Sequence, residues 1–250
     1  MNKPKLSVII PQYNELSNLK KGLLHEAFVT LDMLDLNYEV IVVDDGSTDE
    51  GLNYLKNNYS DKQHLKIIES KHGGKPSAIL HGLNASGGEY VLLSDMDQST
   101  PMKEVKKLLP FMGQYQAIIG SRGGKRNSAS ILRKISGLMF STFRRVFILR
   151  RIDDTQCGFK LFDALTLKKV YPRLNALKTT NVHGWSVSAF DVELLYLIQR
   201  TGGKIKEVKV DWKDEDVSDT KKRKFFKESL DMLKQVMMVV GREITGRYSS

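Results

Sequence analysis

Two near-continuous apolar runs near the start of the chain constrain its fold more than any other feature. The first covers residues 6–11 and ends at a proline, and the second covers residues 39–43 and ends at Asp44, Asp45 and Gly46. Runs that are apolar at nearly every position are typical of strands buried on both faces of a parallel sheet. Between them, residues 19–34 carry apolar side chains at helical spacing. The pattern predicts a β-α-β unit.

The same alternation continues along the chain and indicates the fold class. We expect a helix that opens at Thr48, a helix over 77–85, and strands over 65–68, 89–93 and 117–120. This order predicts an α/β fold, Rossmann-like, with a mostly parallel sheet flanked by helices. At 250 residues, with 41% hydrophobic and 27% charged residues, the chain suits one large globular domain. We assign residues 1–215 to this domain and residues 216–250 to a basic amphipathic helix and tail.

Two carboxylates, Asp95 and Asp97, follow the strand expected over 89–93. They would lie at the carboxyl end of that strand, where open α/β sheets bind their ligands. Mg²⁺ and Mn²⁺ take oxygen ligands, usually one or two carboxylates together with substrate phosphates. We therefore predict a divalent metal site at Asp95 and Asp97, with Gln98 as a further ligand. Taken alone, an Asp-X-Asp triplet is more often a solvated loop or a helix cap.

The formal net charge of +10 implies an anionic partner, and nucleotides, nucleic acids and anionic lipids all qualify. Arginines and lysines alternate with apolar residues over 131–151, and the pattern recurs after residue 221. Helices of this kind can lie in a bilayer interface or can pack on the domain with their charges in water. We favour the membrane for 131–151 and leave both alternatives open for the C-terminal helix.

Other features bear on the compartment. No apolar stretch reaches the length of a membrane span, and the first residues lack the apolar core of a signal peptide. The single cysteine, Cys157, fits a reducing compartment, and its expected place in a strand favours packing over reactivity. We expect a cytoplasmic protein that associates peripherally with a membrane. The five histidines show no zinc-ligand spacing, so we expect them to be ordinary surface or core residues.

Several motifs together resemble the family-2 inverting glycosyltransferases, which have a GT-A fold. The motifs are Ser7–Glu15, Val42–Asp49 and Asp95–Asp97. Two later segments, Asp154–Phe162 and Phe190–Leu195, resemble the polyprenyl-phosphate sugar synthases, first the dolichyl-phosphate glucose synthase branch and then the dolichyl-phosphate mannose synthases. The motifs occur in order over about the first 230 residues, so the resemblance covers nearly the whole chain.

The resemblance implies an enzyme that moves a hexose from a nucleotide sugar to a polyprenyl phosphate, dolichyl or undecaprenyl, with the help of Mg²⁺ or Mn²⁺. UDP-glucose is the first expected donor and GDP-mannose the second. A phosphate acceptor is already ionised at neutral pH and needs no strong general base. The implied partners are the nucleotide sugar, the polyprenyl phosphate, a membrane surface and, as in some members, an anchoring subunit. No nucleic acid is expected.

The resemblance also assigns roles to residues by their place in the matched motifs. The catalytic group comprises Asp95, Asp97, Arg122 and Asp191. The nucleotide-sugar contacts comprise Pro11, Tyr13, Glu15, Asp44, Asp45, Lys75, Asp95, Met96, Arg133 and Arg223, of which Arg133, like Arg122, faces the phosphates. Gln156 and Lys160 are expected to line the acceptor side. Each residue also has an ordinary structural alternative: a packed aromatic for Tyr13, a solvated lysine for Lys75 and a helix cap for Asp191.

Three rival functions remain to be separated. A family-2 glycosyltransferase that extends a glycan on a sugar hydroxyl would need a carboxylate as base. A basic membrane- or nucleic-acid-binding module would need neither Asp95 nor Asp97 and would bind in a salt-dependent manner. A nicotinamide dehydrogenase is disfavoured because no Gly-X-Gly-X-X-Gly follows the first strand.

Overall fold

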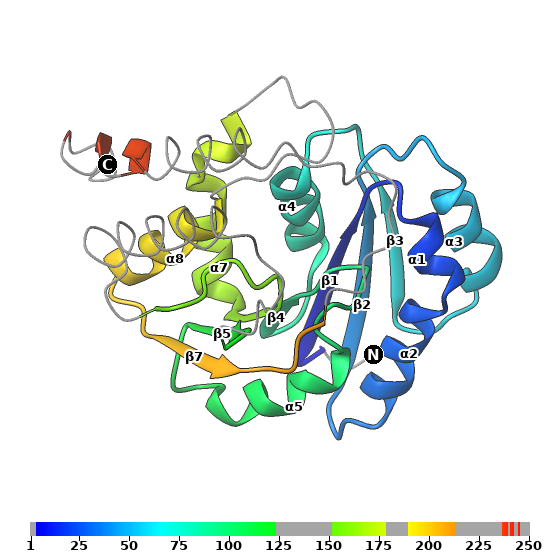
Figure 1. Ribbon diagram of the computed structural model, residues 1–250, viewed down its shortest axis with the longest axis horizontal. Helices are drawn as coiled ribbons and strands as arrows, with labels where there is room; N and C mark the ends of the chain where they lie inside the picture. The colour runs from blue at the N-terminus through cyan, green and yellow to red at the C-terminus, as the bar shows by residue number, and fades with distance from the viewer. Residues whose placement is uncertain are drawn as a thin grey trace, which may run out of the picture.

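The computed structural model describes residues 4–123, 152–178, 190–213, 237–239, 241–242 and 245. Within these residues, seven strands form one sheet in the order β3-β2-β1-β4-β6-β5-β7 (Figure 1). The strands are β1 (Leu6–Gln12), β2 (Tyr38–Asp44), β3 (Leu65–Glu69), β4 (Tyr90–Leu93), β5 (Ala117–Ser121), β6 (Lys160–Asp163) and β7 (Ile205–Lys209). Every neighbouring pair is parallel except the two that involve β6, which runs antiparallel to both β4 and β5. The predicted α/β fold with a mostly parallel sheet is confirmed.

Helices cover both faces of this sheet (Figure 1). One face packs against α4 (Lys75–Ala85), α7 (Ala164–Val170) and α8 (Phe190–Arg200). The other packs against α1 (Leu16–Lys20), α2 (Leu23–Asp32), α3 (Gly51–Tyr59) and α5 (Val105–Leu108). Short 3₁₀ turns complete the described elements: η1 (Met102–Glu104), η2 (Leu109–Phe111), η3 (Tyr171–Arg173) and η4 (Asn175–Lys178).

Strand β1 shows why the first apolar run has no polar alternation. Ile9 packs in the cluster beneath α4, whereas Val8 and Ile10 pack in the cluster beneath α1 and α2. All three side chains are buried, and burial of each contributes roughly 1.5–3 kcal/mol. Because successive side chains of a strand face opposite sides, a strand covered on both sides needs apolar residues throughout.

Two expectations about elements were wrong. Residues 19–34 do not form one helix, because the chain breaks at Gly22, whose φ of 79° lies in the left-handed region. Cys157 does not lie in a strand but in the loop before β6, where it is nonetheless buried and unoxidised, and burial raises the pKa of its thiol. Its packing role is therefore confirmed.

The predicted amphipathic segments lie largely outside the described residues. This holds for all of 131–151, and of 216–250 the structure describes only 237–239, 241–242 and 245. Val239 is buried in the apolar cluster on the α8 face of the sheet, so the C-terminal segment contacts the domain at that residue. No helix within the described residues is both long enough and apolar enough to traverse a lipid bilayer.

Candidate active site

The carboxyl-terminal ends of β1, β2, β4 and β5 lie side by side along the sheet. We call this row of strand ends an edge of the sheet, as distinct from an edge strand. Strand order reverses between β1 and β4, because β2 and β3 extend the sheet on one side of β1 and β4 on the other. Ligands of open α/β sheets bind at such a switch point. Since β6 is antiparallel, its first residue, Lys160, reaches the same edge. Lys75, Asp95, Asp97, Lys160 and Asp191 are gathered there.

Lys75 and Asp95 form an ion pair across this edge. Lys75 is the first residue of α4, and its Nζ lies 2.5 Å from Oδ1 of Asp95, just beyond β4. Burial acts to lower the pKa of Lys75, but the carboxylates of Asp95, Asp191 and Asp97 outweigh it and raise that pKa above its ordinary value. Lys75 is therefore charged and held among carboxylates, and the alternative of a solvated lysine is excluded.

The turn after Asp95 is compact and leaves one buried oxygen without a partner. Oδ1 of Asp97 accepts the Ser99 amide at 2.9 Å. Gln98 has a φ of 47°, and its amide nitrogen donates to the Asp95 carbonyl at 2.9 Å and to Ser94 Oγ at 3.2 Å. A carbonyl can only accept, so this contact fixes the amide orientation and points Oε1 elsewhere. Among the described residues, Oε1 of Gln98 is buried without a hydrogen-bond partner.

These oxygens fit a hard divalent cation. Two carboxylates and an unpartnered amide oxygen are ligands that Mg²⁺ and Mn²⁺ accept. No group of three or more histidine, cysteine or acidic side chains placed to hold a metal occurs in the described part of the chain. A cation at Asp95, Asp97 and Gln98 would therefore need further oxygen ligands, which a diphosphate supplies. The assignment of these three residues as ligands stays a prediction.

Gly158 supports the Asp95 carboxylate from the loop before β6. A Cβ atom added at Gly158 would lie 1.9 Å from Oδ2 of Asp95, far inside van der Waals contact. The backbone of this loop thus lies directly against the carboxylate. Only a residue without a side chain permits this approach.

Asp191 and Lys160 form a second ion pair at the same edge. Asp191 lies in the first turn of α8, and its Oδ1 accepts from Nζ of Lys160 at 2.6 Å. The side chain of Lys160 is only 1% exposed, so it cannot line an acceptor groove, and that expectation was wrong. The Asp191 side chain is bound to the sheet through this lysine.

Arg122 forms a bidentate ion pair with Asp154. Its Nε and Nη2 donate to the two carboxylate oxygens of Asp154, both at 2.7 Å, and its guanidinium carbon lies 5.5 Å from the centre of the Trp212 ring. Burial alone would raise the pKa of Asp154, but the Arg122 guanidinium holds it at about 2. The arrangement ties the end of β5 to the loop before β6. Contact of Arg122 with phosphates stays a prediction.

The residues expected around the nucleobase divide into two groups. Tyr13 is partly exposed and stacks on His72, with ring centres 4.4 Å apart. Asp45, by contrast, is fully buried, and its carboxylate accepts from His72 and from the amides of Gly73 and Gly74. Asp45 therefore shapes the loop that leads into α4. Its contact with the nucleotide stays a prediction. His72 was missed, since nothing in the sequence marks it.

The remaining assigned residues are placed as follows. Asp44 is buried and accepts from the side chain of Gln12 at 2.5 Å and from the Ser47 amide at 3.0 Å. Met96 packs inside the apolar cluster, so its side chain does not reach a nucleotide and only its backbone is available for that contact. Pro11 is buried within β1, and Glu15 accepts from Asn18 at the start of α1. Arg133 and Arg223 lie outside the described residues.

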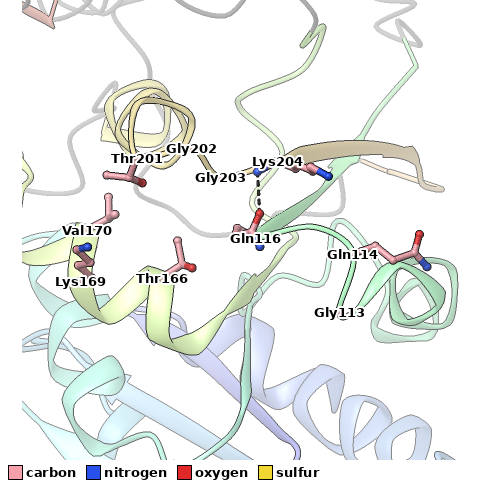
Figure 2. A pocket seen from close by; sticks show the side chains of 10 residues that line it. All are labelled: Gly113, Gln114, Gln116, Thr166, Lys169, Val170, Thr201, Gly202, Gly203 and Lys204. Atoms are coloured by element: carbon pink, nitrogen blue, oxygen red, sulfur yellow. Dashed lines mark hydrogen bonds between the residues drawn. The ribbon is translucent and has the colours of Figure 1, made fainter.

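A cavity of about 500 Å³ lies elsewhere, at the edge where β5 and β7 begin (Figure 2). Figure 2 shows the Gln116 side chain accepting the backbone amide of Lys204 across its floor, at 2.8 Å. No acidic or aromatic side chain lines it, and it lies at the opposite edge from Asp95. The edge that carries Asp95 and Asp191 therefore remains the candidate active site.

Comparison with known proteins identifies the family to which the chain is similar. A sequence model described as glycosyl transferase family 2 matches residues 7–171. A dolichyl-phosphate beta-glucosyltransferase of Dictyostelium discoideum is 33% identical over 260 residues, covering 96% of this chain and 75% of that protein. The human protein of the same name is 33% identical over 264 residues, covering 98% of this chain and 77% of that protein.

Solved structures show the same fold at low identity. A glucosyl-3-phosphoglycerate synthase of Mycobacterium tuberculosis, crystallised with Mn²⁺, UDP and glucosyl-3-phosphoglycerate, is 16% identical with a TM-score of 0.63, covering 95% of this chain and 80% of that one. A mannosyltransferase of Pyrobaculum calidifontis, in complex with GDP-Man and Mn²⁺, is 17% identical with a TM-score of 0.60, covering 98% of this chain and 65% of that one.

Proposed function

The chain belongs to glycosyl transferase family 2, and on that premise we propose that it transfers glucose from UDP-glucose to a polyprenyl phosphate, with inversion at the anomeric carbon. The names of relatives that are 30–34% identical over nearly the whole chain support the choice of glucose and of a dolichyl-type acceptor. The predicted GT-A domain, residues 1–215, contains every described residue used below.

The donor would bind with its diphosphate toward Asp95 and Asp97. A Mg²⁺ or Mn²⁺ ion bound by these residues and Gln98 would neutralise the charge that develops on the leaving diphosphate. Lys75 carries a positive charge at the same place and would contact the diphosphate directly. Because its ammonium group is already held by Asp95, it would need only a small movement to exchange a carboxylate oxygen for a phosphate oxygen.

The acceptor chemistry fits the surroundings of Asp191. A polyprenyl phosphate attacks as an anion and requires no proton acceptor. Asp191 is hydrogen-bonded to one lysine and lies within the electrostatic reach of a second, Lys75. A carboxylate held by a lysine in this way can accept hydrogen bonds from sugar hydroxyl groups through its remaining acceptor positions. We assign Asp191 to the hydroxyl groups of the departing hexose.

The acceptor is a lipid, so we also propose that the protein works at a membrane surface, on the cytoplasmic face. The basic amphipathic segment 131–151 is the element we assign to that contact. An anchoring subunit, as the family resemblance implies, would supplement it.

One observation carries the proposal: at the sheet edge of a family-2 chain, the acid pair after β4, the lysine of α4 and the acid of α8 converge. The test is UDP release from UDP-glucose with purified protein, with and without polyprenyl phosphate, in Mn²⁺ or in EDTA. We expect release that depends on both the metal and the lipid phosphate. GDP-mannose and a sugar-hydroxyl acceptor serve as competing substrates. Faster turnover with GDP-mannose would overturn the assignment of the donor, and faster turnover with the sugar hydroxyl would overturn the assignment of the acceptor.

Asp97→Ala supplies the matched variant for this assay. Loss of a group that stabilises developing charge costs roughly 10²–10³ in turnover. Asp61→Ala removes an exposed carboxylate from the turn after α3, and this control variant should retain full activity. Equal activities of the two variants would exclude the acid pair from the reaction.

A further inference from the structure

Lys160 is a lysine in a place where a sheet protein ordinarily has an apolar residue. It begins β6, a strand between β4 and β5, and it pairs with Leu93 on one side and Ile119 on the other. Its side chain is 1% exposed. An ammonium group is costly to remove from water unless it is paired and hydrogen-bonded, so lysines are almost never fully buried without such partners.

The partners of Lys160 account for its charge. Nζ donates to the Cys157 carbonyl at 2.5 Å and to Oδ1 of Asp191 at 2.6 Å. The first contact fixes the ammonium group on the loop before β6, and the second reaches α8. The lysine thus links the sheet, the loop that backs Asp95, and the helix that carries Asp191.

Among the residues that the structure describes, Lys160 is the side-chain hydrogen-bond donor to the Asp191 carboxylate. Its other charged or titratable neighbours act through space: Lys75 on α4, Arg122 after β5 and Tyr171 in η3 each interact electrostatically with it. Lys160 is therefore the group that sets the direction of the Asp191 carboxylate. Oδ1 is bound to Nζ, and the Asp191 side chain is 15% exposed, so the second oxygen, Oδ2, is the candidate acceptor for a ligand.

We propose that Lys160 is a positioning residue for hexose transfer: through the Nζ–Oδ1 contact it orients Asp191 so that Oδ2 accepts a hydroxyl group of the donor hexose. The inference rests on the proposed function and adds to it a residue that never touches the substrate. It also explains why a buried position at the catalytic edge carries a charge, since an apolar residue there would leave the carboxylate without its hydrogen-bond donor.

A double-mutant cycle on Lys160→Met and Asp191→Asn tests the proposal by calorimetric binding. Each single variant should weaken UDP-glucose binding about tenfold and leave UDP binding unchanged, because UDP lacks the hexose. The double variant should be no weaker than Asp191→Asn alone, since Lys160 acts only through Asp191. If wild type prefers GDP-mannose, GDP-mannose and GDP replace this ligand pair.

Two further variants distinguish the positioning role of Lys160 from a general loss of structure. Lys168→Met removes an exposed lysine that donates to the Ser86 carbonyl away from this edge, and it should bind both ligands as wild type does. If Lys160→Met does not fold, as judged by circular dichroism, Lys160→Arg takes its place in the cycle. Arginine keeps the charge but moves the donor atoms, so the selective loss of UDP-glucose affinity should persist.

Equal losses of UDP and UDP-glucose affinity, or additive losses in the double variant, would overturn the role of Lys160. Wild-type protein that binds the sugar nucleotide but does not transfer hexose to polyprenyl phosphate would overturn the proposed function, while the binding cycle still decides the role of Lys160. The two failures are therefore distinguishable.

Discussion

At the scale of single residues, the candidate site is built from charges that hold one another in place. Lys75 pairs with Asp95, Lys160 with Asp191, and Arg122 with Asp154. Each pair joins two segments that are far apart in the sequence. Formation of the site therefore depends on the whole sheet, and small steric changes at the edge should affect activity more than stability.

Gly158→Ala should abolish most activity while the protein stays folded. Its Cβ would overlap Oδ2 of Asp95 at 1.9 Å, so the carboxylate has to leave its position. We expect a loss of turnover of roughly 10²-fold, since a displacement of about 1 Å at reacting groups has that effect. The assay is metal-dependent UDP release. Gly87→Ala is the matched control, because its Cβ would meet its nearest atoms at an ordinary 3.6 Å, and it should remain active.

The lowered pKa of Asp154 predicts how the free energy of unfolding depends on pH. Its pKa is about 2 in the folded protein, below the ordinary value, so the Arg122–Asp154 pair stabilises the fold above about pH 4 and loses this contribution as the pH falls toward 2. The contribution at neutral pH is about 2 kcal/mol, about half of which is lost by pH 3. Urea unfolding of wild type and Asp154→Asn should differ accordingly at pH 6 and converge toward pH 3. A difference independent of pH would show that the ion pair is not its source.

At the scale of elements, residue patterns predicted the buried parallel strands well but did not predict the antiparallel strand β6. The five strands expected from apolar runs are all present, because burial on both faces leaves a continuous signature in the sequence. The antiparallel direction of β6 has no such signature, since this four-residue strand holds only two apolar residues, Leu161 and Phe162, between Lys160 and Asp163. For the same reason the burial of Lys160 could not be foreseen: it follows from which strands flank β6.

The residues of the site also divide into those that a local sequence pattern predicts and those that it does not. Asp95 and Asp97 were found because they end a recognisable strand. His72 and Asp154 were given no role in the site because their partners lie 27 and 32 residues away, on segments whose contact only the fold determines. A contact between residues so far apart in the sequence leaves no local spacing pattern from which it could be predicted.

Gly22→Ala tests the break between α1 and α2. Nothing lies within 4 Å of the added Cβ, so any effect comes from the backbone, whose φ of 79° is unfavourable for alanine. We expect destabilisation by about 1 kcal/mol with unchanged activity. Urea unfolding measures it. A stabilised variant would instead indicate that the two helices can merge into the single helix that the apolar spacing predicts.

At the scale of the whole molecule, the net charge of +10 and the lipid nature of the proposed acceptor lead to one expectation. Replacing Arg144, Arg145, Arg150 and Arg151 with glutamine should reduce sedimentation with anionic vesicles by about tenfold or more, because each basic residue near such a surface contributes about 1 kcal/mol. Replacing Lys20, Lys103, Lys106 and Lys169, which are exposed on the described domain, removes equal charge and should have a smaller effect. Equal effects would indicate that total charge, and not the 131–151 segment, drives adsorption.

The reversed direction of β6 has a consequence for how chains of this architecture can diversify. The connection from β5 to β6 leaves from Ser121 and returns at Lys160, and both residues lie on the rim where transfer would occur. A parallel strand would have forced that connection to cross to the opposite rim before the strand could begin. Here it starts and finishes at the same rim, so the stretch between Gly123 and Ile152 can change in length or sequence while the strand pairings and the Arg122–Asp154 pair stay as they are. Grafting this stretch between homologues should therefore transplant acceptor preference without rebuilding the domain.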